Sequence, residues 1–298
     1  MYERDFKEIG LLNAGAFGQV FRATRRLDGY DYAVKKITFD ATGYSDESIQ
    51  RVIREVQCLA AVNDHSNIVR YYTKWTEVYD DSYMTKSAAR RRTHLFIQME
   101  LCHPATLQDW IMERNIRIPD SNHEERLGPA LEIFQQLCSG LAHIHKANII
   151  HRDLKPANIF VCNEGKVIKI GDFGLSKQLQ NIAKNSSTDG PPNPSTQILV
   201  EYNAGGVNPP LLTTGIGTAS YAAPEILSKS YDTSVDIFSL GLIFLELVSC
   251  FETDHERLHN LQQCRYQRVP KWIDDKFPDI SSTILACTRP NPSDRPKA

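Results

Sequence analysis

The sequence predicts an α+β fold with two unequal lobes, a small N-terminal lobe built on a sheet and a larger, mainly helical C-terminal lobe. In the first hundred residues, β-branched and aromatic side chains alternate as they do in strands, most clearly over residues 19–23 and 32–37. From about residue 105 onward, apolar side chains recur at helical spacing instead. These two patterns place the small lobe at residues 1–102 and the large lobe at residues 103–298, within one domain.

The small lobe is expected to hold an antiparallel sheet and one helix. Gly29 lies between the two strand-like runs and is a typical turn residue. Ser45 is a suitable N-cap for the helix, because apolar residues follow it at spacings of three or four. These apolar residues are Ile49, Val52, Ile53, Val56 and Leu59.

The large lobe is expected to be organised around two helices. The first is marked by a stripe of apolar residues at helical spacing, to which we assign core packing and no chemistry. The stripe consists of Leu131, Phe134, Leu137, Leu141 and Ile144. The second helix, near residues 235–248, is apolar on most sides and should be buried at the centre of the lobe.

Two segments break these patterns. Residues 184–212 are rich in Pro, Gly, Ser, Thr and Asn, a composition that cannot bury enough apolar surface to fold alone. We expect this segment to be a disordered-like insertion. Residues 79–93 are polar and end in Arg90-Arg91-Arg92-Thr93, so we expect a solvated loop there.

The composition excludes several classes of protein. The chain has 298 residues, with 34 Lys and Arg against 36 Asp and Glu, and its formal charge of −2 argues against a direct nucleic-acid partner held by a net basic field. Its seven cysteines form no Cys-x-x-Cys pair, which favours reduced thiols and a cytoplasmic location. Residues 235–248 include two acidic side chains and are too short to span a bilayer, so we expect no membrane contact within this segment, although a longer parent protein could be anchored.

The first candidate site is a glycine-containing segment between two predicted strands, Asn13-Ala14-Gly15-Ala16-Phe17-Gly18-Gln19-Val20. Glycines allow a backbone turn to lie closely over phosphates, although two glycines three apart are also common in an ordinary hairpin. Lys35 follows on an apolar strand, where a lysine either contacts a phosphate or extends into solvent. Glu55, on the predicted helix, is a candidate ion-pair partner for this lysine.

The strongest chemical signal is His151-Arg152-Asp153-Leu154-Lys155-Pro156-Ala157-Asn158, followed by Asp172-Phe173-Gly174. Asp153 can accept a hydroxyl proton, and Asn158 and Asp172 offer oxygen ligands for Mg²⁺. Each motif alone has a structural explanation. Their ordered combination with Lys35 predicts phosphoryl transfer.

This ordered set resembles the eukaryotic protein kinase family over almost the entire chain, and the resemblance implies a two-lobed protein-kinase fold with ATP and Mg²⁺ as cofactors. It implies that Lys35 orients the α- and β-phosphates and pairs with Glu55. It further makes Asp153 the catalytic base and Lys155 a γ-phosphate contact, as is typical of the serine/threonine class. Asn158 and Asp172 become the Mg²⁺ ligands.

The resemblance also implies where the nucleotide binds. The backbone of Glu100 and Cys102 would supply hinge hydrogen bonds, and Met99 would be the gatekeeper. The full set of residues implied around ATP is Leu12, Asn13, Gly15, Gly18, Val20, Ala33, Lys35, Met99, Glu100, Cys102 and Phe160. Further along, Ala223-Pro224-Glu225 would close the activation segment, with Arg295 paired to Glu225.

Three further blocks, residues 67–77, 95–102 and 236–242, are similar to the kinases of the translation initiation factor 2 alpha subunit, of the general-control and endoplasmic-reticulum types. This similarity implies that the alpha subunit is the protein substrate, in stress-linked control of translation, and that the small lobe mediates homodimerisation. Thr253 is implied as a substrate-docking contact, although a solvent-facing helix cap explains the same residue equally well.

The resemblance implies regulation by phosphorylation of Thr213, with Thr218 lining the pocket for the substrate residue. Arg152 precedes the catalytic base and could pair with a phosphate on the activation segment. Asn13 replaces the first glycine of the phosphate loop, and we expect the turn to survive because asparagine tolerates left-handed backbone angles. The chain ends directly after Arg295-Pro296, so we expect the catalytic domain of a longer protein.

Three hypotheses remain open from the sequence. The leading one is a serine/threonine kinase that phosphorylates the initiation factor 2 alpha subunit. The second keeps the kinase but gives it another signalling substrate. The third is a pseudokinase scaffold, against which the intact Lys35, Glu55, Asp153, Asn158 and Asp172 argue.

Overall fold

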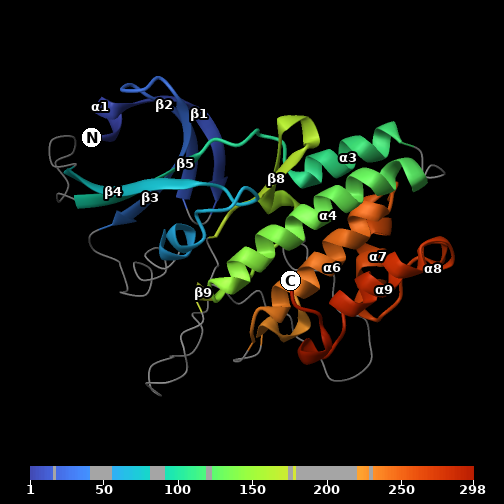
Figure 1. Ribbon diagram of the computed structural model, residues 1–298. Coiled ribbons are helices and arrows are strands. Elements are labelled where there is room, and N and C mark those ends of the chain that lie inside the picture. Colours follow the sequence, from blue (N-terminus) through green and yellow to red (C-terminus); the bar gives the residue numbers. More distant parts are fainter. Residues whose placement is uncertain are drawn as a thin grey trace, which may run out of the picture.

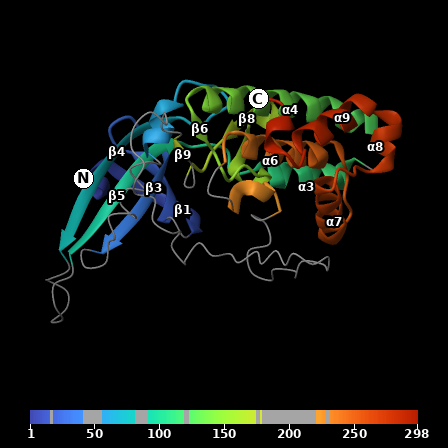
Figure 2. The ribbon, with the colours of Figure 1, turned by 90° about the horizontal axis from the view of Figure 1, so that it is seen from below.

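A computed structural model describes residues 1–15, 18–40, 56–80, 91–118, 123–173, 177–178, 220–227 and 231–298. A sheet occupies one end of the molecule and a group of helices the other, and two perpendicular views agree on this arrangement (Figures 1 and 2). The predicted α+β, two-lobed fold is confirmed.

The small lobe is a five-stranded antiparallel sheet of order β1-β2-β3-β5-β4. Its strands are β1 (Phe6–Gly15), β2 (Gly18–Arg25), β3 (Asp31–Asp40), β4 (Tyr71–Asp80) and β5 (Arg91–Glu100). The two strand-like runs of the sequence are therefore the centres of β2 and β3. Of the predicted helix that ends near Leu59, residues 56–61 are helical and the preceding part lies outside the described residues.

The predicted loop at residues 79–93 is wrong at both ends. β4 continues to Asp80 and β5 begins at Arg91, because the two strands remain paired, with Asp80 opposite Arg91 and Tyr79 opposite Arg92. Pairing with a distant strand decides the structure here, so a polar composition did not indicate a loop. Residues 81–90 lie outside the described residues.

An aromatic cluster fastens the N-terminus to the sheet. The short helix α1 (Tyr2–Asp5) places the ring of Tyr2 4.6 Å from that of Phe96 and 6.4 Å from that of Trp75. Trp75 in turn stacks on Phe6 and Phe96 at 5.6 and 5.2 Å. Stacked rings at these separations stabilise beyond their buried area, so this cluster holds β1, β4 and β5 together.

The large lobe contains helices and two short ladders. The helices are α3 (Leu107–Arg117), α4 (His123–Lys146), α6 (Ser234–Val248), α7 (Asp254–Arg265), α8 (Lys271–Lys276) and α9 (Pro278–Cys287). The ladders pair β6 (Ile149–Ile150) with β9 (Lys177–Gln178) and β7 (Ile159–Cys162) with β8 (Val167–Ile170). Short 3-10 turns lie at Pro156–Asn158, Asn163–Gly165, Pro224–Leu227 and Pro292–Asp294.

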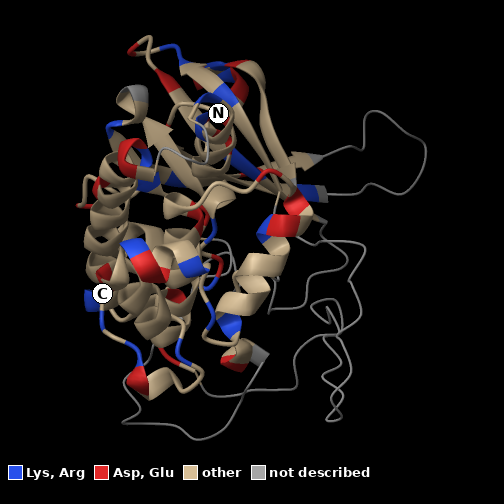
Figure 3. Ribbon diagram, turned by 90° about the vertical axis from the view of Figure 1, so that its right-hand side faces the viewer, with Lys and Arg blue, Asp and Glu red and all other residues tan. Residues whose placement is uncertain are grey.

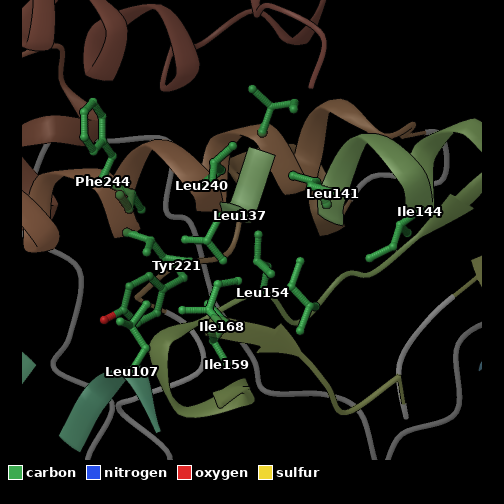
Figure 4. Packing of buried hydrophobic residues seen from close by; sticks show 14 of the residues in the cluster. Leu107, Leu137, Leu141, Ile144, Leu154, Ile159, Ile168, Tyr221, Leu240 and Phe244 are labelled. Atoms are coloured by element: carbon green, nitrogen blue, oxygen red, sulfur yellow. The ribbon is translucent and has the colours of Figure 1, made fainter. Parts of the chain in front are cut away.

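The core of this lobe forms around α6, as the sequence predicts. Every residue from Val235 to Val248 is buried, and Figure 4 shows side chains of α4 and α6 gathered around the catalytic-loop region. Gly241 permits a close approach, because a Cβ at this position would lie 2.6 Å from Cys287 Cβ on α9.

The predicted stripe on α4 is correct in part. Leu137, Leu141 and Ile144 are fully buried, whereas Leu131 is 42% exposed. Ile133 takes the buried place instead. A helical template can be laid on this sequence in two overlapping registers, and only packing against α6 selects between them.

The charged residues are spread over the surface rather than gathered by sign. Figure 3 shows acidic and basic positions interspersed over both lobes. No helix within the described residues is long and apolar enough to cross a membrane. All seven cysteines are free thiols.

Candidate active site

The catalytic loop brings three predicted side chains together. Lys155 Nζ donates to Asp153 Oδ2 at 2.9 Å, and Asn158 Nδ2 donates to the same oxygen at 2.9 Å and to the Asp153 carbonyl at 2.8 Å. The turn Pro156–Asn158 makes this possible by folding Asn158 back over the loop. One carboxylate oxygen is thereby fixed by two donors, which suits a group that must be oriented to accept a proton from a hydroxyl.

A buried carboxylate on α6 holds the catalytic loop from beneath. Asp236 is 1% exposed and accepts hydrogen bonds from the backbone N–H of His151 and of Arg152, each at 2.8 Å. His145 Nε2 lies 2.9 Å from the same side chain. Sequence reasoning placed Asp236 only in the central helix. Its task of orienting the loop becomes visible because the fold joins positions 84 residues apart.

The two proposed metal ligands lie on adjacent backbone segments. The Gly171 N–H donates to the Asn158 carbonyl at 2.9 Å, which places Asp172 beside Asn158. Asp172 is exposed and adopts φ 54°, while the next residue, Phe173, is buried. The His151 ring fixes this geometry, since its Nε2 lies 2.9 Å from the Gly171 carbonyl and its ring contacts that of Phe173 at 4.9 Å.

This donor set fits Mg²⁺. The bonds from Asn158 to Asp153 use the amide nitrogen, so the amide oxygen is available as a ligand, and Asp172 adds a carboxylate at an exposed position. Amide and carboxylate oxygens are the ligands Mg²⁺ prefers, and it keeps the rest of its octahedron for water and phosphate.

Lys35 lies on the inner face of the sheet. It pairs with Val20 on β2 and Ile97 on β5, and it is only 7% exposed. A lysine with so small an exposed fraction does not extend into solvent. The structure therefore argues against the solvent-exposed lysine, one of the two alternatives that the sequence left open. Glu55, its predicted partner, lies outside the described residues.

The strands that would cover the adenine are in register. Ala33 is opposite Met99, and Asn13 is opposite Val20. Phe160, on β7, is the residue that the resemblance adds to this set from the large lobe. Its ring packs so tightly against Gly171 that a Cβ there would lie 2.7 Å from it.

In the glycine-containing turn, the backbone conformation of Asn13 differs from the expectation. Gly18 takes the special backbone, with φ 115°, and a Cβ on it would collide with the Lys36 carbonyl. Asn13 is in β1 and is not among the described non-glycine residues of positive φ. Its tolerance of left-handed angles is therefore not needed. Gly15 ends β1 opposite Gly18, and Leu12 is 43% exposed beside Asn13.

A cavity of about 440 Å³ lies beside the proposed hinge residues. Glu100 and Cys102 line it, together with Cys162 and Lys169 of the β7–β8 ladder. Lys169 Nζ donates to Glu100 Oε2 at 3.0 Å and so ties the hinge to the large lobe. Burial and the neighbouring Cys162 raise the pKa of the Cys102 thiol well above its usual range, so this thiol stays protonated at neutral pH.

The end of the activation segment is anchored as the resemblance implied. Arg295 is 7% exposed and forms a two-pronged ion pair with Glu225, with Nη2 donating to Oε2 at 3.0 Å and Nη1 donating to Oε1. Thr213 and Thr218, the proposed phosphosite and pocket residue, lie outside the described residues, as does the insertion 184–212.

Thr253 is the N-cap of α7. Its hydroxyl accepts the Glu256 N–H at 3.1 Å, and the side chain is exposed. The helix-cap alternative is thus correct as geometry. Because a capping hydroxyl on an exposed helix end still has an accessible methyl and lone pair, the docking role stays a prediction.

The two-lobed fold, together with a loop in which Lys155 and Asn158 both bond to Asp153, is what an ATP-dependent phosphotransferase domain requires. Comparison with known sequences agrees, since the protein kinase domain family matches residues 6–298. The chain therefore belongs to the protein kinase family and is a serine/threonine kinase domain.

Three relatives illustrate the range of similarity. The interferon-induced, double-stranded RNA-activated protein kinase of Rattus norvegicus is 39% identical over 291 residues, which cover 95% of this chain and 48% of that protein. The eIF-2-alpha kinase GCN2 of Arabidopsis thaliana is 35% identical over 332 residues, covering 100% and 24%. The Wee1-like protein kinase 1-B of Xenopus laevis is 30% identical over 319 residues, covering 100% and 45%. The chain thus spans half or less of the length of each of these proteins.

Proposed function

We propose that this chain transfers the γ-phosphoryl group of ATP to a serine or threonine of the translation initiation factor 2 alpha subunit, in stress-linked control of translation. The observation that supports the chemistry best is the catalytic loop, in which Asp153 is fixed by Lys155 and Asn158. The printed names of several relatives, which call them eIF-2-alpha kinases, support the substrate.

The mechanism needs little covalent chemistry from the protein. ATP would supply the phosphoryl group. Asn158 and Asp172 would hold Mg²⁺, which when bound would supply positive charge against the phosphates. Asp153 accepts the proton of the substrate hydroxyl, and the lysine bonded to it keeps its carboxylate oriented. Lys35 offers a fixed positive charge on the inner face of the sheet, where surrounding side chains exclude water and strengthen its field.

Asp236 contributes preorganisation rather than chemistry. Because it accepts two backbone N–H groups of the loop, the loop does not need to reorder when substrate binds. Donors and acceptors that are positioned before the reaction avoid a reorganisation cost in the transition state. The same logic applies to the bond between the His151 ring and the Gly171 carbonyl, which joins the base to the metal-ligand segment.

A second candidate function keeps the reaction and changes the protein substrate. The similarity to Wee1-like kinases, at 30% identity across the whole chain, favours testing it. We also propose that the chain dimerises through its small lobe, and that phosphorylation of Thr213 activates it. If Thr213→Ala leaves activity unchanged in protein able to autophosphorylate, that site is not the switch.

The substrate experiment compares two acceptors. Purified chain with Mg-ATP is given equal concentrations of intact initiation factor 2 alpha subunit or a generic basic protein, and initial rates of phosphate transfer are measured. We expect a higher kcat/KM for the alpha subunit. Preference for the basic protein would reject the substrate while leaving the kinase assignment in place, and absence of transfer to either would support the scaffold hypothesis.

A further inference from the structure

Residues 220–227, at the end of the activation segment, are hydrogen-bonded directly to helix α7. Arg257 Nη1 on α7 donates to the Tyr221 hydroxyl at 3.2 Å and to Glu246 Oε1 at 3.0 Å. The Tyr221 hydroxyl itself donates to Glu246 Oε2 at 2.6 Å. One guanidinium, one phenol and one carboxylate therefore join three elements: the segment 220–227, α6 and α7.

A second arginine fastens the same segment at the other end of the helix. Arg265 Nη2 donates to the Ser220 and Ala222 carbonyls, at 2.7 and 2.8 Å. Its guanidinium also lies 5.2 Å from the ring of Phe238 on α6. Both ends of α7 thus hold a stretch of three consecutive residues in position.

The two side chains that Arg257 contacts are buried. Glu246 is 3% exposed and Tyr221 6%, and Figure 4 shows the Tyr221 ring among aliphatic core side chains with its hydroxyl oxygen at the edge of the group. Burial raises the pKa of Glu246, while the bonds from Tyr221 and Arg257 act in the opposite direction. A buried carboxylate with these partners binds them tightly, because each lost partner leaves the charge uncompensated.

The described end of the activation segment is continuous in sequence with the predicted pocket residue. Thr218 lies outside the described residues and precedes Ser220 by two positions in the sequence. At the other end of the connection, Thr253 is four residues before Arg257, which is about one helical turn. The docking candidate and Tyr221, at the described end of the activation segment, are therefore linked through one arginine.

We propose that Arg257 is a positioning residue that couples the docking helix α7 to the loop that receives the substrate residue. This inference rests on the proposed function, because it treats α7 as the docking helix of a protein kinase. The guanidinium suits the task, since its planar fork satisfies the phenol and the carboxylate from one fixed plane. A lysine in its place keeps the charge but has no such fork.

The test separates catalysis from binding. Arg257→Lys and Tyr221→Phe are compared with Gln262→Ala, an exposed position on the same helix, and with Thr253→Ala. We expect Arg257→Lys to lower kcat on the alpha subunit by about tenfold, with KM for ATP and for the protein within about twofold, as for a small misplacement of the acceptor. Thr253→Ala should instead raise KM for the protein, and Gln262→Ala should change neither constant.

A double-mutant cycle adds a readout that a merely structural role would not move. If Arg257 and Tyr221 act as one unit, the variant with both Tyr221→Phe and Arg257→Lys should have the kcat of the weaker single variant. Multiplicative losses would overturn the proposal. So would an Arg257→Lys variant whose kcat equals that of Gln262→Ala, or one whose KM for ATP rises together with the loss of kcat.

Two controls keep the outcome interpretable. Thermal unfolding identifies a temperature at which every variant is folded, and Tyr221→Phe, which removes a single hydroxyl, tests the same connection with little change in volume. If the wild type prefers the generic basic protein, the substrate proposal fails. The coupling is then judged by the same kcat comparison on the basic protein, where equal values for Arg257→Lys and Gln262→Ala overturn it.

Discussion

The catalytic loop and strand β1, which we propose to face the nucleotide, are stabilised in opposite ways. The loop rests on the buried Asp236, which accepts two of its backbone N–H groups. On β1, by contrast, Leu11 is 55% exposed and Leu12 is 43% exposed, and the ladder to β2 is irregular between Leu11 and Asn13. The loop is therefore in place before any ligand binds, whereas β1 has apolar surface left for a ligand to cover.

This difference predicts a gradient of mutational effects. Groups that touch the reacting oxygen have fixed partners, so removing them or their support should cost most. Leu11, Leu12 and Asn13 at the far end of β1 are exposed, so their replacement should cost little. Each of the following predictions tests a point on that gradient.

The largest effect is expected at the base itself. Asp153→Asn keeps an oxygen that can accept the Lys155 bond but cannot accept a substrate proton, so kcat should fall roughly a thousandfold, within the usual range for a general base. ATP affinity should stay unchanged. Single-turnover phosphate transfer and nucleotide titration measure the two quantities.

The matched control is Asp275→Asn, an exposed position on α8. It should leave both rate and affinity unchanged. An Asp153→Asn variant with more than about a tenth of the wild-type kcat would contradict the assignment of Asp153 as base and would leave proton transfer to another group.

The next effect is expected at the support of the loop. Asp236→Asn replaces one carboxylate oxygen by an NH₂ group that would face a backbone N–H, leaving a buried donor without an acceptor. Unfolding free energy should fall by about 2 kcal/mol, and kcat should fall as well because the loop loses its fixed position. Denaturant unfolding and steady-state rates on one preparation test this together. A stable variant with normal kcat would show that the loop holds its shape without α6.

An effect on stability alone, with none expected on the chemical step, distinguishes buried from exposed ion pairs in the large lobe. Arg295→Ala leaves Glu225 without its buried partner and should cost about 3 kcal/mol of unfolding free energy. Arg117→Ala removes the ion pair with Glu113, in which the Arg117 side chain is 67% exposed and the Glu113 side chain 65%. This change should cost no more than about 0.5 kcal/mol of unfolding free energy. Equal losses of unfolding free energy in urea would mean that burial does not determine how much these ion pairs stabilise the fold.

The sequence was informative wherever a role depends on neighbouring residues. Asp153, Lys155 and Asn158 are within five positions of one another, and their spacing alone predicts the group that the fold assembles. The pair of Glu225 and Arg295, 70 residues apart, was implied by family resemblance and is confirmed. The same resemblance says nothing of how Arg257 reaches Tyr221, a connection across 36 residues that only the packing of α7 on α6 creates.

The sequence failed where local composition was taken as a guide to tertiary pairing. Asp80 and Arg91 read as parts of a polar loop, yet opposite each other they extend a strand pair. Leu131 matched a helical stripe but is 42% exposed. In both cases the deciding interaction is with a segment distant along the chain, to which a local window is insensitive.

The smallest effect is expected on β1. Asn13→Gly restores the residue that the kinase pattern has at this position, and nucleotide affinity should change by less than about tenfold, roughly 1.4 kcal/mol. The reason is structural: Asn13 is exposed, lies opposite Val20 in a strand, and does not occupy a left-handed conformation that glycine would relieve. Titration calorimetry with ATP measures the change, and Asn13→Ala, which keeps a Cβ, is the control. If both variants weaken binding more than tenfold, the Asn13 side chain contacts the nucleotide. Side chains on β1 would then have contacts as specific as those of the catalytic loop, and the contrast between the two regions would disappear.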